Sequence, residues 1–147
     1  VEDLTEGGWF IEMDPAGTYA LVIGGNIVVA ELAAERVFTD LVATGDGVLF
    51  VTSFRPYTDE CSIGGKGQLW AVMLDTGGAT GSLLKGTAVM QVSTGAIEKI
   101  DMSEAFTEKG GRRSEPIEGK PPISQGLALQ SQPPPVERVL HFIEREY

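Results

Sequence analysis

The sequence has very little of the chemistry on which most catalytic and metal sites depend. Among 147 residues there is one cysteine, Cys61, and one histidine, His141. A zinc site needs several cysteine or histidine ligands, and a disulfide within the chain needs a second cysteine. We therefore expect no zinc site, and Cys61 is either a free thiol or the partner of a cysteine on another polypeptide.

The motifs of the common enzyme classes are absent as well. There is no Walker motif, no dinucleotide-binding glycine motif and no Gly-x-Ser-x-Gly motif. A dyad of Cys61 and His141 has little support, because the carboxylates of Asp59 and Glu60 disfavour a reactive thiolate beside them. We therefore expect a protein with no catalytic residues, no cofactor and no enzymatic activity.

Basic residues are scarce, and the imbalance is concentrated in the first third of the chain. The formal net charge is −10, and residues 1–50 hold nine acidic side chains but one basic side chain, Arg36. Such a surface repels phosphate backbones, so we expect no nucleic-acid partner. No apolar run reaches the roughly 18 residues that a membrane-spanning helix needs, so we expect no membrane span.

What the sequence does contain is typical of an all-β protein. Hydrophobic residues make up 42% of the chain, which suffices for a packed core, and 19 glycines indicate many tight turns. Alternating or β-branched apolar runs lie between these turns and predict about nine short antiparallel strands. The mostly apolar run 48–54 predicts a buried strand, and the run 68–74 predicts a further strand. We also expect Trp9 and Trp70 to lie in the core.

Two hairpins stand out in this pattern. The first joins two apolar runs through Gly24-Gly25, and a glycine pair in this position is a strong signal for a two-residue hairpin turn. The second joins two further runs through Ser93-Thr94-Gly95. The alternation of side chains over residues 9–13 predicts another strand, which begins at Trp9.

Residues 103–135 differ from the rest of the chain. They hold six of the eight prolines and few large apolar residues, so we expect an extended arm that is not a packed element. Within it, residues 110–113 form a short basic turn, which we interpret as a solvated loop in preference to a grip on a carboxylate of the acidic N-terminal half. Residues 1–102 are then the β region. Residues 136–147 form a C-terminal strand that closes it, with a short helix as the alternative.

One block of the sequence resembles a known family. Residues 35–80 contain an E-R-V start, an apolar strand, a D-x-C-S-x-G-G loop and a second strand that ends in D-T-G-G. This order resembles a late part of the β-propeller in the PilY/PilC family of type IV pilus biogenesis proteins. Residues 8–13 resemble the strand that precedes this block. The matching loop and turn residues are Asp59, Cys61, Ser62, Gly64, Gly65, Asp75, Thr76, Gly77 and Gly78.

The resemblance implies a fold and a function. The chain would form the C-terminal blades of a β-propeller-like domain, with residues 1–102 as the propeller-blade-like β region. It would be exported to the periplasm, the cell surface or the pilus. It would act in pilus assembly and surface adhesion through contacts with pilin, with minor pilins, and with the rest of the propeller or other copies of the chain. In an oxidising compartment Cys61 could form an intermolecular disulfide or pair with a cysteine earlier in the full protein. The family's calcium loop, D-x-D-x-D-G, does not occur here, so calcium binding is not implied for any residue.

Some features depart from this pattern and leave other interpretations open. Residues 14–34 are longer than the family's connection, which suggests an inserted hairpin. The chain starts at Val1, without a leader-like segment, so we expect a processed chain or a fragment. A structural subunit of an extracellular fibre would pair the arm and the terminal strand with the sheet edges of neighbouring chains. An enzyme on a quinoprotein-like propeller would need a cofactor cradle and a metal site, and the sequence displays neither.

Overall fold

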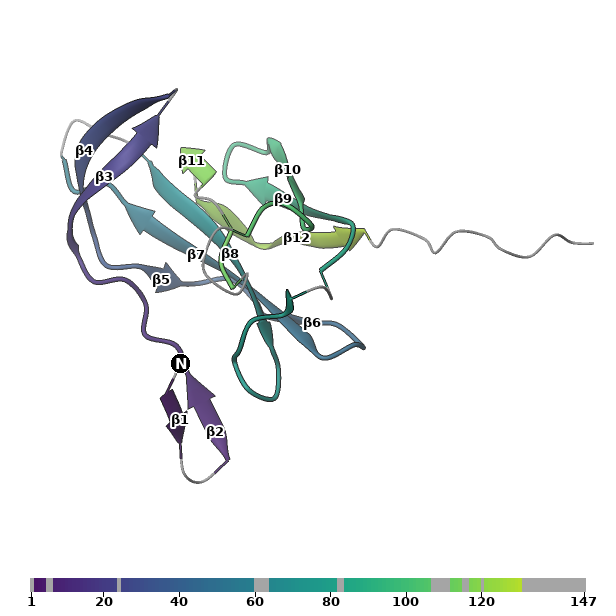
Figure 1. Cartoon of the computed structure of the whole chain (residues 1–147). Coiled ribbons are helices and arrows are strands. Elements are labelled where there is room, and N and C mark those ends of the chain that lie inside the picture. Colours follow the sequence, from purple (N-terminus) through teal and green to yellow (C-terminus); the bar gives the residue numbers. More distant parts are fainter. Residues whose placement is uncertain are drawn as a thin grey trace, which may run out of the picture.

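The named elements of the structure are all β-strands (Figure 1). The computed structural model describes residues 2–4, 7–23, 25–59, 64–81, 84–106, 112–114, 117–119 and 121–130. All of the strand pairs within these residues are antiparallel. The all-β class predicted from the sequence is therefore confirmed.

Four sheets make up this part of the chain. Two are two-stranded, and pair β1 (Glu2–Leu4) with β2 (Gly8–Phe10) and β3 (Gly17–Ile23) with β4 (Asn26–Leu32). A three-stranded sheet has the order β10 (Ile97–Asp101), β9 (Thr87–Val92), β12 (Pro122–Gln130). A five-stranded sheet has the order β11 (Ile117–Gly119), β8 (Gly65–Met73), β7 (Val48–Pro56), β5 (Arg36–Val37), and β6 (Val42–Ala43) also pairs with β7.

The centre of the molecule is the pair β7–β8, which is buried on both faces. Phe50 pairs with Ala71 and Ser53 pairs with Gln68. Side chains of a strand alternate between faces, and directly opposed residues share a face. Phe50 and Ala71 therefore lie on one face of the sheet, while Ser53 and Gln68 lie on the other. The buried strand predicted over residues 48–54 is therefore confirmed as β7, and β8 is buried as well.

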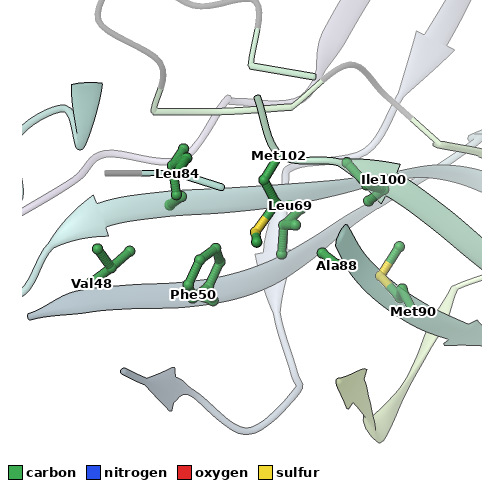
Figure 2. Close-up of a cluster of buried hydrophobic side chains, with 9 residues drawn as sticks. Val48, Phe50, Leu69, Leu84, Ala88, Met90, Ile100 and Met102 are labelled. Atoms are coloured by element: carbon green, nitrogen blue, oxygen red, sulfur yellow. The ribbon is translucent and has the colours of Figure 1, made fainter. Parts of the chain in front are cut away.

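The apolar face of this pair meets the three-stranded sheet. Figure 2 shows Phe50 of β7 and Leu69 of β8 opposite Ala88 and Met90 of β9. Each of these four side chains is at most 2% exposed. The hydrophobic core therefore lies between two sheets. Its other buried members are Val48, Ala71, Leu84, Ile100 and Met102.

Both hairpins predicted from glycine-containing turns are present. β3 and β4 pair from Gly17↔Leu32 to Ile23↔Asn26, and β9 and β10 pair along five residues. The strand expected over residues 9–13 is shorter, because β2 ends at Phe10. The core position expected for Trp70 is confirmed at 4% exposure, whereas Trp9 is half-buried.

The expectation that residues 103–135 contain no packed element is wrong. β11 pairs with β8, and β12 pairs with β9 over most of its length. Leu127 and Leu129 of β12 pack against the core. The proline at the start of β12 is tolerated because a strand's first residue can lack an amide donor. The predicted terminal strand, 136–147, lies outside the described residues.

The structure also bears on membrane insertion. Across the residues that it describes, no helix has the length and apolarity needed to cross a membrane.

Candidate protein-binding surface

The β3–β4 hairpin carries an apolar face that nothing in the described structure covers. Val22 pairs with Ile27, and Ala20 pairs with Val29. These four residues therefore share one face of the two-stranded ribbon. Val22 is 70% exposed, Ile27 77% and Val29 67%. The ribbon lies apart from the larger sheets in Figure 1 and falls in the segment, 14–34, where an inserted hairpin was expected.

The opposite face of the ribbon is held against the rest of the molecule along part of its length. Leu21 is 7% exposed and Leu32, at the base of β4, is 1% exposed. The amide of Ala33 donates to the carbonyl of Pro56 at 2.9 Å. Leu32 also forms a β-bridge with Tyr57. The base of the ribbon is thus fixed to the end of β7, and its orientation is set by the body of the protein.

Tyr19 provides a second anchor on this face. The guanidinium of Arg55 lies over the Tyr19 ring, with its carbon 3.8 Å from the ring centre. The Tyr19 hydroxyl donates to the carbonyl of Pro15 at 2.7 Å, and Arg55 Nη2 donates to the same carbonyl at 3.0 Å. A cation over an aromatic face contributes about 0.5–2 kcal/mol, and more as water is excluded. Arg55 is 4% exposed, so this contact lies at the upper end of that range.

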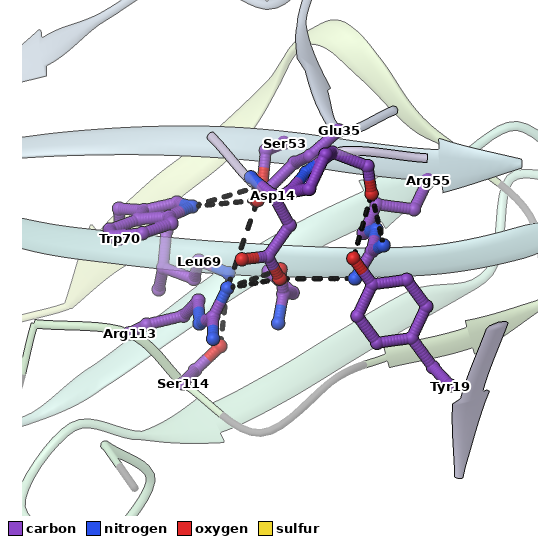
Figure 3. A network of polar contacts seen from close by, with 11 residues as sticks. Asp14, Tyr19, Glu35, Ser53, Arg55, Leu69, Trp70, Arg113 and Ser114 are labelled. Carbon is purple, nitrogen blue, oxygen red and sulfur yellow. Dashed lines mark hydrogen bonds and ion pairs between the residues drawn. The ribbon is translucent and has the colours of Figure 1, made fainter. Parts of the chain in front are cut away.

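Arg55 belongs to a buried polar cluster on the second face of β7–β8 (Figure 3). Its centre is Glu35, whose side chain is fully buried. Glu35 Oε1 accepts hydrogen bonds from Ser53 Oγ and, at 3.0 Å, from Trp70 Nε1. Glu35 Oε2 accepts from the amide of Asp14 at 3.1 Å. A buried carboxylate is tolerable only when its oxygens are paired in this way.

Two arginines balance the charge of this cluster. Asp14 Oδ2 lies 3.0 Å from Arg55 Nη1 and 2.9 Å from Arg113 Nη1. Arg113 Nη1 also lies 3.7 Å from Glu35 Oε2, and the Arg113 guanidinium lies 5.1 Å from the centre of the Trp70 ring. The interpretation of residues 110–113 as a solvated loop is therefore wrong for Arg113, which contacts carboxylates of the acidic N-terminal half.

The arrangement of this cluster is suited to holding segments together. Both carboxylates are engaged by arginines, and Glu35 accepts hydrogen bonds from three further groups. The cluster joins the N-terminal segment, the start of β5, β7, β8 and residues 112–114. Within the described chain, no group of three or more histidine, cysteine, aspartate or glutamate side chains is placed to hold a metal ion.

The residues singled out by the family resemblance do not form one site. Asp59 and Gly64 precede β8, whereas Asp75 and Gly77 follow its end. The nine strand residues between the two pairs correspond to roughly 30 Å along an antiparallel strand. Cys61 and Ser62 lie outside the described residues, as does His141.

The glycines of this motif have structural roles. A Cβ on Gly65 would lie 2.1 Å from the Arg55 carbonyl oxygen, so only glycine allows β8 to approach β7 here. Gly77 has a φ of 63° and sits beneath the Trp9 ring, where a Cβ would come within 2.4 Å of a ring carbon. A tight turn therefore follows β8. Within it, the Gly78 amide donates a hydrogen bond to Thr76 Oγ1 at 3.3 Å.

Sequence reasoning missed the polar cluster and the role of Arg55. One signal was available, because Arg55 follows an apolar run that predicts a buried strand. An arginine is almost never buried without a partner, so its position already required a carboxylate nearby. The sequence alone could not say that Asp14 supplies this carboxylate, since the two residues are 41 positions apart.

The chain was compared with protein-family models, with curated proteins and with solved structures. None of the three comparisons found a match.

Proposed function

We propose that this chain is a non-enzymatic part of a PilY/PilC-like exported protein that acts in type IV pilus assembly and surface adhesion. It acts through protein–protein contacts. The observation that carries this proposal is the apolar face of the β3–β4 ribbon. Contiguous exposed apolar patches on a soluble protein mark interaction sites, and this one is presented by a rigidly anchored hairpin.

The resemblance of residues 35–80 to the family supplies the biological setting. It rests on the loop around Cys61 and on the Asp75–Gly78 turn. In the β-propeller of that family, blades bury their apolar faces against neighbouring sheets. A ribbon face formed by Ala20, Val22, Ile27 and Val29 is suited to such a contact, with the rest of the propeller, another copy of the chain, or a pilin as the partner.

The rival interpretation, a fibre subunit that donates its arm to a neighbour, has less support. In that interpretation residues 103–135 pair with the sheet edge of another chain. Residues 122–130 of this arm are instead occupied as β12, which pairs with β9 of the same chain. The ribbon therefore remains the better candidate for contact with another polypeptide.

The proposal is tested in the organism that encodes the chain. Deletion of the gene should lower the amount of pilin in the sheared surface fraction, and the wild-type gene should restore it. The triple substitution Val22→Thr, Ile27→Thr, Val29→Thr should restore it poorly. Each change removes about 1 kcal/mol of apolar burial at an interface, so partner affinity should fall by about two orders of magnitude. Threonine keeps the strand propensity of the ribbon.

The matched control is Ile97→Thr, which alters another exposed apolar side chain in β10. It should complement as the wild type does, at equal protein levels on immunoblots. Unchanged surface pilin after deletion would refute the role in pilus assembly. Full complementation by the triple variant would refute the role of the ribbon.

A further inference from the structure

A cavity of about 250 Å³ opens at the seam between the two large sheets. Val42 of β6 and Thr52 of β7 line one side of it. Met90 of β9 and Leu127 of β12 line the other side. The remaining described lining residues are Thr39, Asp40, Pro122 and Ile123. The cavity thus reaches from the surface to Met90, a core residue that is 1% exposed.

An irregularity in β12 shapes this cavity. The register of β12 against β9 shifts between Pro122 and Leu127. Gly126 lies at this shift, where a Cβ would come within 2.9 Å of the Gln91 carbonyl oxygen and 2.8 Å of Ile123 Cγ1. β-Bulges of this kind redirect side chains and are over-represented beside functional sites. Here the residues on both sides of the shift, Pro122 and Leu127, line the cavity.

Exposed apolar side chains lie next in sequence to residues that line the cavity. Phe38 is 47% exposed and Leu41 57% exposed, and both are neighbours in sequence of the lining residues Thr39 and Asp40. Ile123, on the opposite wall, is 40% exposed. A cavity with apolar lining residues such as Val42, Met90 and Leu127 is a place where a partner's apolar side chain can be desolvated and anchored.

Volume and charge restrict what such a cavity accepts. Sites for cofactors and drug-sized ligands occupy about 300–1,000 Å³, so a volume of 250 Å³ is better matched to a single large side chain. Asp40 is the one ionisable side chain among the described lining residues, and it is exposed. A cation placed next to the inserted side chain is therefore the complementary charge.

We propose that this seam cavity, lined by Thr39, Asp40, Met90 and Leu127, is a second docking site on the protein. It binds an extended segment of another polypeptide that presents one large apolar side chain flanked by lysine or arginine. The apolar side chain enters between β6–β7 and β12, and the cation pairs with Asp40. This inference is separate from the β3–β4 ribbon and does not depend on the proposed role in pilus assembly.

The test uses the methyl groups of the four methionines as NMR probes, with the peptide Ac-AKLKA-NH2 as ligand. Binding should shift the Met90 methyl signal in a saturable way, with a dissociation constant in the millimolar range. The Met102 methyl, which lines a different cavity, should stay unchanged. The acidic peptide Ac-AELEA-NH2 should bind several-fold more weakly, because its charges are repelled by Asp40.

Substitutions distinguish the contribution of the apolar contact from that of the ion pair with Asp40. Asp40→Asn should weaken the lysine peptide about two- to fivefold, the range for an exposed ion pair. It should leave the acidic peptide no weaker. Leu41→Ser should weaken both peptides. Ile97→Ser is the control, because this side chain is similarly exposed but lies in β10, and it should change neither affinity.

Three outcomes would overturn the proposal. The first is no shift of Met90 at millimolar peptide, and the second is equal affinity for the two peptides. The third is a Met90 shift that depends on protein concentration without peptide, which would identify the seam as a contact between copies of this chain. All variants change exposed side chains, so each should keep the wild-type fold. An unchanged amide spectrum checks this, and a loss of binding can then be assigned to the altered side chain.

Discussion

At the scale of single residues, Glu35 is the buried charge at the centre of the polar cluster. Its fully buried carboxylate receives hydrogen bonds from Ser53, Trp70 and the amide of Asp14, and lies 3.7 Å from Arg113. Removing one partner of a buried charge network leaves the others desolvated and unpaired, which costs more than the interactions themselves contribute.

Glu35→Ala should lower the free energy of unfolding by about 3–5 kcal/mol. Urea unfolding followed by tryptophan fluorescence measures this, since Trp70 lies in the same cluster. Glu104→Ala, a change at an exposed glutamate, is the control and should stay within about 0.5 kcal/mol of the wild type. A loss below about 1 kcal/mol for Glu35→Ala would contradict the central role given to this carboxylate.

Asp101 accepts hydrogen bonds that change the pKa of its carboxyl group. Ser103 Oγ donates to Asp101 Oδ1 at 2.7 Å, and the amide of Ser103 donates to the same oxygen at 3.0 Å. The side-chain bond from Ser103, followed by its backbone bond, lowers the pKa of Asp101 below its ordinary value. Hydrogen bonds that favour the charged carboxylate act in this direction.

The lowered pKa of Asp101 determines how the stability of this turn depends on pH. Since the folded pKa is below the unfolded one, the turn is stabilised above the ordinary aspartate pKa of about 3.9. That stabilisation is lost as the pH falls towards the folded pKa. In a carboxyl ¹³C NMR titration, Ser103→Ala should raise the pKa of Asp101. An unchanged titration curve in Ser103→Ala would show that the hydroxyl does not hold this carboxylate charged.

At the scale of elements, adjacent apolar residues of the β3–β4 ribbon differ sharply in their exposure. Leu21 and Val22 are neighbours in β3, yet they are 7% and 70% exposed. Alternation along a strand places them on opposite faces. Leu21 faces the body of the protein, and Val22 belongs to the face proposed to bind a partner.

Leu21→Ala should therefore cost about 2–3 kcal/mol of stability, near the lower end for a buried leucine, because the ribbon is thin and can relax. Val22→Ala should change stability by about 0.5 kcal/mol or less. Thermal or urea unfolding of the two variants checks the difference. Equal losses would mean that the exposed face is covered in solution, for example by another copy of the chain.

The same scale shows why some elements were predictable and one was not. The hairpins β3–β4 and β9–β10 follow from local turn residues, because the paired strands are adjacent in sequence. β12 is different, because its partner β9 is distant in the sequence. β10 and residues 103–121 lie between the two strands along the chain. The proline of β12 and its few large apolar residues give no local signal for a strand. The place of β12 is set by its pairing with β9.

At the scale of the whole molecule, the polar cluster ties together distant parts of the chain. Asp14 and Arg113 are 99 residues apart and are joined by a contact of 2.9 Å. Through this contact the N-terminal segment and residues 112–114 both cover the second face of β7–β8. The ribbon follows directly from the N-terminal segment, so its position depends on the cluster.

A double-mutant cycle with Asp14→Ala and Arg113→Ala should give a coupling energy of about 1 kcal/mol. The value is modest because the Asp14 side chain is 34% exposed and Arg55 remains as a second partner. The measurement is the free energy of urea unfolding for the wild type, the two single variants and the double variant. Additive losses would show that the two residues do not act together. The pair Asp46→Ala and Arg113→Ala is the control, and it should be additive.

The sequence by itself determined the β class, the two glycine-turn hairpins and the buried strand β7. These depend on the pattern of apolar side chains and on turn residues, which act between neighbours in the chain. The tertiary structure alone decided the place of β12, the pairing of Arg55 and Arg113 with Asp14 and Glu35, and which face of the ribbon stays exposed. Each of these depends on which distant segment covers a surface. No local pattern encodes that choice, because a buried charge or an open strand edge accepts any partner of the right chemistry.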